Sequence, residues 1–485
     1  MSRLADLIQN CPPTLADMAI AGIASDSRDV GPGYLFAALP GSRRDGRVYI
    51  DQAVDNGAAI ILAPKGTYSP VPLLVSDDPR RELALMASRL AAKQPRTVAA
   101  VTGTAGKTST AWFVRAIWTE LGKRAGYLGT LGLYAPDVEP KYSLTTPDPV
   151  TLSAELKALA DAGVDHLALE ASSHGIDQRR LDGVTLTAAA FTNLGRDHLD
   201  YHRDMDGYFE AKARLFETLL PGNGTAVIHA GSEWGQKMIQ RAKDRGLKLI
   251  TYGTPHADLA LISRQPAPGG QKLDISVFGK FVTIQLPVAG TFQADNALAA
   301  LGLVIACGGD ADAATDALNR LPGVPGRMQT VGSLNGAPVI VDYAHKPDAL
   351  ASVLEGARPM VSGRLIVIVG CGGDRDAGKR PIMGEIAARL ADIAIITDDN
   401  PRSEDPATIR AAVLAGCNGP GQAAEIGDRR VAIQKVIEDL KAGDMLVIAG
   451  KGHESGQIVG FETLPFNDAE VAQDVIRSLG GEVRA

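Results

Sequence analysis

The run TVAAVTGTAGKTST at residues 97–110 determines the kind of fold that this chain adopts. It starts with small, apolar and β-branched residues, typical of a buried strand, and continues through a glycine-rich turn into a helix-like stretch. The turn contains Gly103 and Gly106, followed by Lys107 and Thr108. Glycines let backbone N–H groups approach phosphate oxygens, the lysine neutralises the β- and γ-phosphates, and the hydroxyl is a ligand for Mg²⁺. The run therefore predicts a phosphate-binding loop for a nucleoside triphosphate and Mg²⁺.

The match to the usual phosphate-loop pattern is incomplete. That pattern has a glycine five residues before Gly106, and this chain has Val101 there, which leaves a shortened loop of the form TGTxGKT. The alternative is an ordinary glycine turn between a strand and a helix. Because Gly-Lys-Thr follows the strand directly, we favour the nucleotide-binding interpretation.

The composition is that of a globular protein with several domains. The chain has 485 residues, of which 45% are hydrophobic and 22% are charged, and this length corresponds to about three domains of ordinary size. The net charge of −7 provides no general attraction for nucleic acid or an anionic membrane. Anionic substrates must then be held by local basic clusters and helix N-termini, and we expect no nucleic-acid partner.

Cysteine usage and the N-terminal residues indicate the compartment. The four cysteines contain no C-x-x-C pair, which argues against a disulfide framework and a structural zinc site and favours a reducing environment. No uninterrupted apolar run is long enough to span a bilayer, and Asp6 and Asp17 lie where a signal peptide would be basic and then apolar. We therefore expect a cytoplasmic protein with no membrane partner.

The pattern of strands, helices and linkers predicts an α/β fold with three domains. Residues 1–95 alternate short β-like and helical runs and reach the polar, proline-containing segment KQPR at 93–96. Residues 96–326 begin with the phosphate-loop strand, and their alternating elements predict a mostly parallel central sheet covered on both faces. The segment LPGVPGR leads into residues 327–485, where apolar strands followed by polar or glycine residues predict a third α/β unit.

Two groups of polar residues follow predicted strands of the central domain, at the sheet edge where open α/β sheets bind ligands. Glu170 ends the strand-like part of LALEASSHG, so its carboxylate is placed to reach a Mg²⁺ held by Thr108 and the phosphates. Alone, such a glutamate is as often a surface residue, but the serines and histidine behind it favour a functional role. The segment TNLGRDHLDYH at 192–202 has five ionisable residues, which favours a metal or phosphate role for His198.

Lys212 has two interpretations. It lies in a helical stretch with the apolar residues Phe209, Ala213 and Phe216 around it, and such a lysine usually extends along the helix surface to bring its ammonium group to water. From the residues alone, this structural interpretation is preferred. If the amine were buried instead, its pKa would fall, and the neutral amine could react with CO₂ to give a carbamate that bridges Mg²⁺ ions.

In the third unit, polar loops follow four parallel-type strands and indicate one shared crevice. They contain VDYAH at 341–345, the glycine-rich run at 370–380, DNPR at 399–402 and GKGHE at 450–454. Each alone could be a solvated loop. Together, their arginines suit carboxylates and Glu454 suits an ammonium group, so the crevice fits a zwitterion.

Taken together, these motifs closely resemble those of the Mur ligases, ATP-dependent enzymes that form amide bonds in peptidoglycan synthesis. The resemblance covers nearly the whole chain and is carried by TGTAGKTS, TTPD at 145–148, EASSHG, NLGRDHLDYH, AKARLF around Lys212, GR at 326–327, VDYAH and GGDRDAGKRP. It implies a three-domain architecture with a central P-loop parallel sheet and a Rossmann-like C-terminal domain.

Within the family, DSR at 26–28 with PGYLFAAL, and DNPR with GKGHE, are similar to members that add meso-2,6-diaminopimelate to UDP-N-acetylmuramoyl-L-alanyl-D-glutamate. This similarity implies that ATP activates the terminal carboxylate as an acyl phosphate, which the amine then attacks with release of ADP and phosphate. The expected setting is cytoplasmic synthesis of peptidoglycan precursors, and with it cell wall biogenesis, cell shape and cell division. The expected partners are the small-molecule substrates alone, with the chain acting as a monomer.

The resemblance also implies roles for residues in nucleotide binding and catalysis. The catalytic groups are expected to be Lys107, Lys212, Glu170 and His198, with Mg²⁺ ligands from Thr108, Glu170, His198 and Lys212 as its carbamate. ATP is expected to contact Gly103, Thr104, Ala105, Gly106, Lys107, Thr108, Ser109, Asn296, Arg327, Asp342 and His345. The chain departs from many relatives at Ala105, where they have Asn, and at Gly456, where they often carry a bulkier residue.

The substrate-binding residues that the resemblance implies fall into three groups. The uridine end is expected to meet Ser25, Ser27, Ser42, Arg43 and Arg44. The peptidyl end is expected to meet Thr145, Thr146, Ser172, Gln178 and Arg180. Diaminopimelate is expected to meet Arg375, Asp399, Asn400, Pro401, Arg402, Gly450 and Glu454.

Three alternatives remain open. A lysine-adding homologue would differ at the DNPR site. A ligase similar to folylpolyglutamate synthase shares the P-loop and the lysine helix but lacks a uridine-binding domain of the type that residues 1–95 would form. A nucleotide-dependent switch, from another class, would not need a third domain with an amino-acid pocket.

Overall fold

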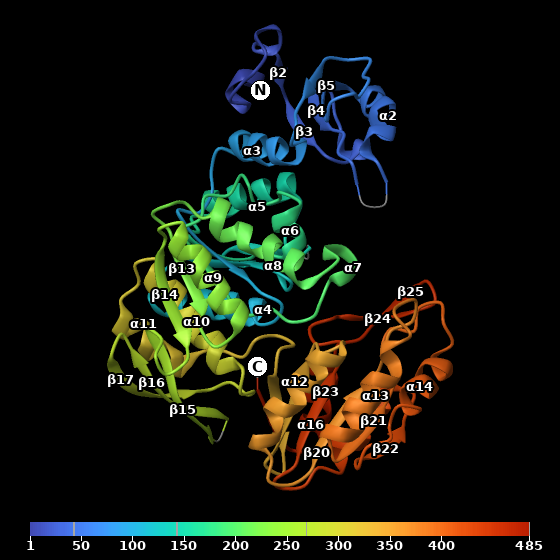
Figure 1. The fold of residues 1–485 in the computed structure, drawn as a ribbon. Coiled ribbons are helices and arrows are strands. Elements are labelled where there is room, and N and C mark those ends of the chain that lie inside the picture. Colours follow the sequence, from blue (N-terminus) through green and yellow to red (C-terminus); the bar gives the residue numbers. More distant parts are fainter. Residues whose placement is uncertain (42–43, 142–143, 268, 485) are drawn as a thin grey trace. The chain divides into compact units, whose positions relative to one another are not determined.

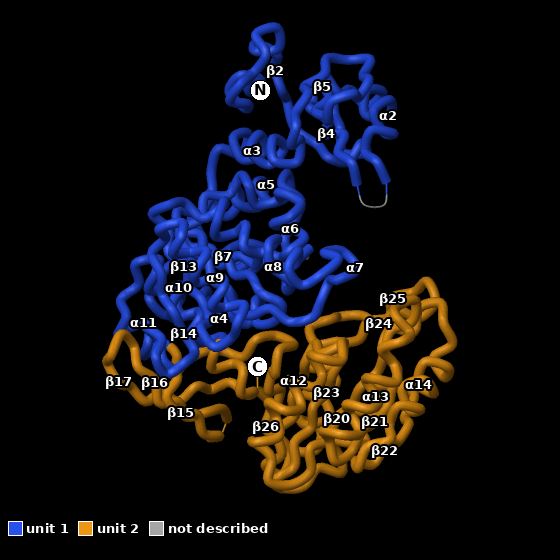
Figure 2. The backbone as a smooth tube through the Cα atoms, viewed as in Figure 1, with its two compact units in different colours: residues 1–260, 296–317 blue, residues 261–295, 318–485 orange. Residues whose placement is uncertain are grey.

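The computed structural model describes residues 1–41, 44–141, 144–267 and 269–484, whose path Figure 1 shows. They form two compact units, coloured separately in Figure 2. Unit 1 consists of residues 1–260 and 296–317, and unit 2 of residues 261–295 and 318–485. Among the described residues, the longest helices have 14 residues, and none combines the length and apolarity that a membrane crossing requires.

The N-terminal part of unit 1 contains a parallel four-stranded sheet in the order β3-β4-β5-β6. Successive residues of β4 and β5 point to opposite faces, so Leu35 and Phe36 enter two different hydrophobic clusters. A two-stranded pairing of β1 with β2 lies apart from this sheet. The elements are β1 (Ser2–Arg3), α1 (Leu4–Leu7), β2 (Ala19–Ile20), β3 (Gly22–Ala24), β4 (Tyr34–Ala37), α2 (Ile50–Asp55), β5 (Ala58–Ala63), β6 (Leu73–Val75) and α3 (Pro79–Ala91).

The central sheet of unit 1 has the order β10-β9-β8-β11-β7-β12-β13-β14-β15. Strands β8, β11, β7, β12, β13 and β14 are parallel, and β9 and β10 add antiparallel strands at one edge. The strands are β7 (Thr97–Thr102), β8 (Ala125–Gly129), β9 (Gly132–Ala135), β10 (Val138–Lys141), β11 (His166–Glu170), β12 (Ala188–Phe191), β13 (Thr225–His229), β14 (Lys248–Gly253) and β15 (Leu259–Ala267), whose first two residues belong to unit 1.

Strand β7 is central to this sheet, between β11 and β12, and all of its residues are buried. Such a strand has helices on both faces, which is why its sequence is apolar throughout and not alternating. The parallel register brings the residues that follow β7, β11 and β12 to one edge of the sheet. The helices of this part are α4 (Lys107–Glu120), α5 (Pro149–Asp161), α6 (Ser173–Asp177), α7 (Leu199–His202), α8 (Met205–Arg214), α9 (Glu233–Asp244), α10 (Gln293–Ala306) and α11 (Ala311–Ala317).

Unit 2 is built around a seven-stranded sheet in the order β22-β21-β20-β23-β19-β18-β26. Strands β19 to β23 pair in parallel, and β18 and β26 are antiparallel at one edge. The strands are β16 (Gly270–Val277), β17 (Lys280–Leu286), β18 (Gln329–Leu334), β19 (Ala337–Asp342), β20 (Leu365–Val369), β21 (Ile393–Ile396), β22 (Gln422–Glu425), β23 (Met445–Ala449), β24 (Gly456–Val459), β25 (Glu462–Pro465) and β26 (Glu482–Val483). Among them, β16 and β17 pair antiparallel and follow β15 in its sheet, whereas β24 and β25 form a separate antiparallel pair.

Helices cover both faces of this sheet. On one face Leu365 packs in a cluster with residues of α12, α13 and α14, and on the other Ile366 packs in a cluster with residues of α15 and α16. These helices are α12 (Pro347–Ala357), α13 (Lys379–Leu390), α14 (Pro406–Leu414), α15 (Arg429–Glu438) and α16 (Asp468–Ser478). A parallel sheet between two helical layers confirms the predicted α/β class and the Rossmann-like character of the C-terminal part.

Candidate active site

The loop between β7 and α4 has a backbone that only glycine permits at two positions. Gly103 and Gly106 have φ angles of 153° and 86°. A Cβ atom on Gly103 would lie 1.9 Å from Thr192 Oγ1, and one on Gly106 would lie 2.4 Å from Asn296 Oδ1. The loop therefore packs so closely against its neighbours that a side chain at either glycine would clash. Asn296, which is predicted to bind the nucleotide, lies beside the loop within unit 1.

The segment that follows β12 fixes the shape of this loop. Thr192 Oγ1 donates to Ala105 O at 2.6 Å, and Asn193 Oδ1 accepts from Ala105 N at 2.9 Å. Thr104 N donates to Asn193 O at 3.0 Å. The buried hydroxyl residues Thr108 and Ser109 lie in the first turn of α4, which begins at Lys107. A helix that starts behind a glycine loop directs its first N–H groups at an anion, so the geometry suits phosphate.

Two lysine side chains converge on one carbonyl oxygen of the loop. Lys107 Nζ donates to Gly103 O at 2.8 Å and to Thr104 O at 2.9 Å, and Lys212 Nζ donates to Gly103 O at 2.9 Å. Lys212 is 1% exposed, so the expectation that it extends to water is wrong. Burial, and then repulsion from Lys107, lower the pKa of Lys212 well below its ordinary value. The structure therefore provides a buried amine that readily loses its proton.

Tyr208 links this amine to the histidine loop. Lys212 Nζ lies 4.4 Å from the centre of the Tyr208 ring, and the Tyr208 hydroxyl is 3.2 Å from Thr104 Oγ1. The His198 ring is edge-on to the same tyrosine with ring centres 6.1 Å apart, and its Nε2 is 3.4 Å from Asp197 Oδ2. Burial raises the pKa of Tyr208 to about 12, so the phenol stays neutral. Lys212 and His198, which the sequence places apart, are thus held around one aromatic ring.

Glu170 is a fully buried carboxylate that contacts only neutral donors among the described residues. Its Oε1 accepts from the Tyr127 hydroxyl and from Thr130 N, and its Oε2 from Thr130 Oγ1 at 3.2 Å. Burying a carboxylate away from water costs free energy, and a metal ion bound beside it would offset that cost. Its strand pairs in parallel with β7, with Glu170 opposite Val101, which places it at the loop edge of the sheet.

These features fit a Mg²⁺ site with few protein ligands. Within the described ranges, no three His, Cys, Asp or Glu side chains are grouped for a metal ion. Mg²⁺ commonly takes only one or two carboxylates and completes its shell with phosphate oxygens and water. The Thr108 hydroxyl and Glu170 carboxylate meet this requirement, and a Lys212 carbamate with His198 would supply a second set.

The residues predicted for the peptidyl end form one hydrogen-bonded cluster attached to Glu170. Thr146 Oγ1 donates to Glu170 O at 2.9 Å and accepts from Ser172 N at 3.0 Å. Arg180 donates to Thr146 O at 2.7 Å and to Gln178 Oε1 at 2.8 Å. Thr145 joins through its hydroxyl, which is 3.0 Å from that of Thr130. The structure therefore brings this whole predicted group together.

The residues predicted for the uridine end are less uniform. Ser25 is exposed, whereas the buried Ser27 already donates to Gln52 Oε1 at 2.8 Å. Arg44 is exposed and donates to the Tyr49 hydroxyl at 3.1 Å. Ser42 and Arg43 lie outside the described residues.

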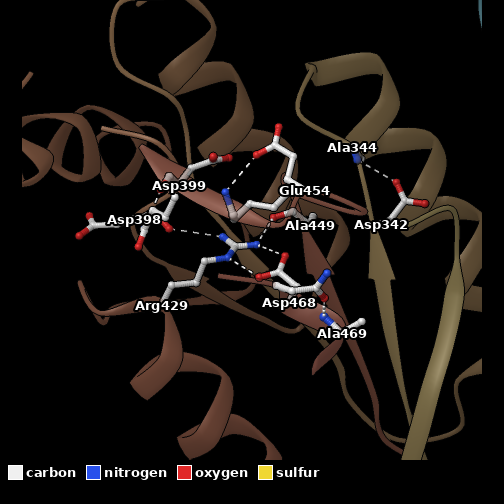
Figure 3. Close-up of polar contacts among 12 residues, drawn as sticks. Asp342, Ala344, Asp398, Asp399, Arg429, Ala449, Glu454, Asp468 and Ala469 are labelled. Atoms are coloured by element: carbon white, nitrogen blue, oxygen red, sulfur yellow. Dashed lines mark hydrogen bonds and ion pairs between the residues drawn. The ribbon is translucent and has the colours of Figure 1, made fainter. Parts of the chain in front are cut away.

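In unit 2, Asp342 ends β19 and holds the turn that follows. It is buried, and its two oxygens accept from Met328 N at 2.7 Å and Ala344 N at 2.8 Å, the second contact visible in Figure 3. Burial raises the pKa of Asp342, an effect that the charge of Arg327 opposes. Arg327 stacks on the Tyr343 ring at 4.6 Å, and His345 Nδ1 is 2.9 Å from Tyr343 O. Arg327, Asp342 and His345 thus form one group around Tyr343.

The GKGHE and DNPR loops meet around a buried lysine that is not among the residues predicted for this site. Lys451 is 0% exposed and donates to Asn400 Oδ1 at 3.1 Å, Glu454 Oε2 at 3.0 Å and Gly456 O at 2.7 Å. Asn400 Nδ2 also donates to Glu454 Oε2 at 2.9 Å. Among the described residues no donor contacts Glu454 Oε1, so this oxygen is available for a substrate ammonium group.

Arg402, like Glu454, has some atoms that bond within the protein and others that have no partner among the described residues. Its φ is 54°, and its Nη1 donates to Gly373 O at 2.8 Å, which ties the DNPR loop to the glycine-rich loop. No acceptor within the described residues contacts its Nε or Nη2, the two donors that can bind a carboxylate side by side. Arg375 is exposed and donates to Asp374 O at 3.0 Å. The remaining predicted residues of these loops, Asp399, Pro401 and Gly450, are buried.

Other contacts were also missed at the sequence level, for a common reason. Thr130, Tyr208 and Lys451 act through partners that are 40, 104 and 51 residues away along the chain. For Lys451, a cation between glycines directly after an apolar strand was the available signal. For Tyr208, the signal was an aromatic residue four positions before Lys212, on the same helix face.

Comparison with known proteins assigns these features to a family. An enzyme of Mesorhizobium japonicum named UDP-N-acetylmuramoyl-L-alanyl-D-glutamate--2,6-diaminopimelate ligase is 53% identical over 467 residues, covering 95% of this chain and 96% of the relative. Residues 19–88, 101–304 and 326–452 match the family models described as "Mur ligase family, catalytic domain", "Mur ligase middle domain" and "Mur ligase, glutamate ligase domain". This chain belongs to the Mur ligase family. Like other Mur ligases, it is an ATP-dependent enzyme that forms amide bonds.

Two further similarities extend over nearly the full length of this Mur ligase. A protein of the same name from Agrobacterium fabrum is 50% identical over 488 residues, covering 99% of both chains. A solved structure, also with that name, superimposes with a TM-score of 0.74 at 34% sequence identity and covers 97% of both chains. The predicted family and three-domain architecture are confirmed.

The first prediction concerns the buried amine. Lys212→Ala is expected to lose most of the ligase activity, because the buried amine beside Gly103, and any carbamate formed on it, is removed while Lys107 remains. A short carboxylic acid added to the assay should restore part of the rate by standing in for the carbamate, whereas Lys212→Arg should stay inactive because guanidinium remains cationic. Rates of ADP release measure this, with the exposed Lys237→Ala as the control. Full activity of Lys212→Ala without an additive would contradict a functional role.

The second prediction concerns Lys451. Lys451→Met is expected to raise the KM for the amino-acid substrate by about tenfold, since Glu454 and Asn400 lose the cation that orients them. The KM values for ATP and the nucleotide-sugar substrate should stay within about twofold. Steady-state kinetics test this, with Lys435→Met on the exposed face of α15 as the matched control. An unchanged amino-acid KM in a folded Lys451→Met protein would show that the lysine is not needed for this orientation.

Proposed function

We propose that this chain adds meso-2,6-diaminopimelate to UDP-N-acetylmuramoyl-L-alanyl-D-glutamate at the expense of ATP, in the synthesis of peptidoglycan precursors. The observation that carries the specificity is the pair of uncommitted groups in unit 2, Glu454 Oε1 and the Nε and Nη2 of Arg402. One suits the ammonium and the other the carboxylate at the distal end of diaminopimelate. The names of the relatives support the same substrates.

The reaction follows from the poor electrophilicity of a carboxylate. The D-glutamyl carboxylate oxygen attacks the γ-phosphorus of ATP, ADP leaves, and an acyl phosphate results. The neutral amine of diaminopimelate then attacks the carbonyl carbon, and phosphate leaves as the nitrogen loses its proton and the amide forms. Both steps bring anionic groups together, so positioning and charge neutralisation are the main catalytic contributions required.

Residues of unit 1 supply these contributions in the proposal. Lys107 and the N–H groups of residues 103–109 hold the phosphates, and the cluster of Thr146, Ser172 and Arg180 holds the peptidyl end. Bound Mg²⁺ supplies charge neutralisation at the phosphate and carboxylate oxygens. Thr108, Glu170, His198 and the Lys212 carbamate are the residues that would hold it. Also in unit 1, the uridine end is contacted by Ser25, Ser27, Ser42, Arg43 and Arg44. In unit 2, Arg327, Asp342 and His345 contribute to nucleotide placement.

The proposal assigns each of the three substrates to a different segment of the chain. Residues 1–95 bind the UDP substrate, residues 96–326 bind ATP, and residues 327–485 bind the amino acid. The positions of the three family matches, 19–88, 101–304 and 326–452, support this division. We further propose that the enzyme works as a monomer in the cytoplasm, where its nucleotide substrates are made, and so serves cell wall biogenesis, cell shape and cell division.

Two other ligase functions make different demands. A lysine-adding enzyme would have no carboxylate to place beside the free donors of Arg402. A folylpolyglutamate synthase would have no use for the parallel sheet of residues 22–75 as a uridine site. The Arg402 geometry therefore favours diaminopimelate.

The third prediction tests the substrate. The unmutated protein, incubated with ATP and UDP-N-acetylmuramoyl-L-Ala-D-Glu, is expected to form a new product only with meso-diaminopimelate from a panel that includes lysine, ornithine and glutamate. Product masses and ADP release should depend on all three substrates together. Tetrahydrofolate with glutamate serves as the comparison for the folylpolyglutamate alternative. Equal rates with lysine would contradict the diaminopimelate assignment and leave the ligase class intact.

The fourth prediction tests Arg402. Arg402→Ala should lower kcat/KM for diaminopimelate by about tenfold to a hundredfold, or ~1.4 to 2.8 kcal/mol, because the distal carboxylate loses its two parallel donors. Use of lysine should change little, which narrows the discrimination between the two amino acids. Arg389→Ala, which removes an exposed ion pair with Glu385 on α13, is the matched control. Retained discrimination in Arg402→Ala would rule out this arginine as the specificity residue.

A further inference from the structure

A fully buried ion pair lies behind the amino-acid loops of unit 2. Arg429 is the first residue of α15 and Asp468 the first residue of α16, and both side chains are 0% exposed. Arg429 Nε donates to Asp468 Oδ1 and Nη2 donates to Asp468 Oδ2, each at 2.7 Å. Figure 3 shows the two planar groups facing each other. The bidentate geometry fixes the guanidinium plane as well as its position.

The remaining hydrogen bonds of Arg429 are to the residues that directly precede two loops. Nη2 also donates to Ala449 O at 2.9 Å, and Nη1 donates to Asp398 O at 3.5 Å (Figure 3). Ala449 ends β23 directly before the GKGHE loop, and Asp398 directly precedes the DNPR loop. One guanidinium thus ties together the main chain at the two points where the proposed diaminopimelate loops begin.

A second set of contacts shows that the spacing of these loops is tight. Gly450 has a φ of 116°, and a Cβ atom there would lie 2.8 Å from Asp399 Oδ2. Gln457 Nε2, beyond the GKGHE loop, donates to Asp399 O at 2.7 Å. Lys451 and Asn400 bridge the same two loops through their side chains. A shift of Ala449 relative to Asp398, the residues that precede the two loops, would therefore change the distance between Glu454 and Arg402.

Stability alone does not account for such a pair. Burying two charges costs desolvation free energy that their attraction repays only in part, and well-packed apolar residues of similar volume often do as well or better. The bonds to Ala449 O and Asp398 O are what an apolar pair could not reproduce. Residues that do not touch a ligand can still set the geometry of its site, because they orient the residues that do touch it.

We propose that Arg429 is a positioning residue, anchored by Asp468, that sets the spacing of the DNPR and GKGHE loops and thereby the selection of the amino acid. Arg429 touches no substrate in this proposal and acts through Arg402 and Glu454. The proposal rests on the proposed function for the identity of the amino acid. The loop geometry itself does not depend on that identity.

The test compares two apolar replacements of ion pairs in the full-length enzyme. Arg429→Met with Asp468→Leu removes the pair behind the loops. Arg364→Met with Asp444→Leu removes a pair directly before β20 and β23, at the opposite edge of the same parallel sheet, where Arg364 and Asp444 are 2.6 Å apart. The first double variant is expected to raise the KM for diaminopimelate by about tenfold or more and to narrow its preference over lysine. Its KM values for ATP and the UDP substrate should stay within about twofold.

The control pair separates positioning from loss of stability. Arg364→Met with Asp444→Leu should lower Tm at least as much, yet leave the KM for diaminopimelate within about twofold. Arg429→Lys, which keeps a cation beside Asp468 but lacks the planar fork that reaches both carbonyls, is measured in parallel and should show the same rise in KM. It decides the question if the double variant does not fold.

Two outcomes would overturn the proposal. One is a KM for diaminopimelate that stays within about twofold in both Arg429 variants, and the other is an equal rise in the control pair. The substrate panel with unmutated enzyme is run first, so failure of the proposed function is seen there. In that case the KM of whichever amino acid is used replaces that of diaminopimelate, and the loop proposal is tested unchanged.

Discussion

The carbonyl oxygen of Gly103 accepts hydrogen bonds from two lysine side chains, and the chemistry available in unit 1 depends on this contact. Lys107 has a second acceptor in Thr104 O, whereas burial, and then repulsion from Lys107, lower the pKa of Lys212, so Lys212 is the amine that gives up its proton. The arrangement requires Gly103 to have a φ of 153° with Thr192 against it, a conformation that a side chain would prevent. The glycine loop thus shapes the amine site as well as the phosphate site.

In unit 2, buried charged side chains also hold loops in place, and they lie near the ends of strands and not in the centre of the core. Asp342 holds the turn after β19 through two backbone N–H groups, Lys451 joins two loops, and Arg429 joins the ends of two strand segments. Each charge has at least one main-chain or side-chain partner in another segment, Met328 for Asp342, Asn400 for Lys451 and Ala449 for Arg429. Buried charges placed in this way contribute geometry to the loops, because their removal would leave unpaired partners on several of them at once.

The parts of the protein that could be predicted from the sequence are those encoded locally. Strand β7, its loop and α4 are contiguous, so hydrophobic pattern and glycines were sufficient for residues 97–110. The surface position that the residues alone favour for Lys212 is wrong, because its apolar neighbours are equally compatible with a surface or a buried lysine and only the packing of α8 against the loop decides. Strand bounds such as Ala188–Phe191 for β12 depend on pairing with β7 and β13 and are not encoded locally. Lys451 was missed because its partner Asn400 is distant in sequence.

The structure also changes how the DNPR motif is understood. The amide of Asn400 is occupied within the protein, since its oxygen accepts from Lys451 Nζ and Ile458 N and its nitrogen donates to Glu454. In the proposed function, Asn400 therefore contributes to recognition by orienting Glu454. Of Glu454 and Arg402, the groups without a partner among the described residues are one oxygen and two nitrogens. An acceptor and a pair of donors match an ammonium and a carboxylate on one carbon, which diaminopimelate carries at its far end and lysine does not. Under the proposed function, selectivity then follows from which atoms the protein leaves unpaired, and not from the number of charged residues in the loops.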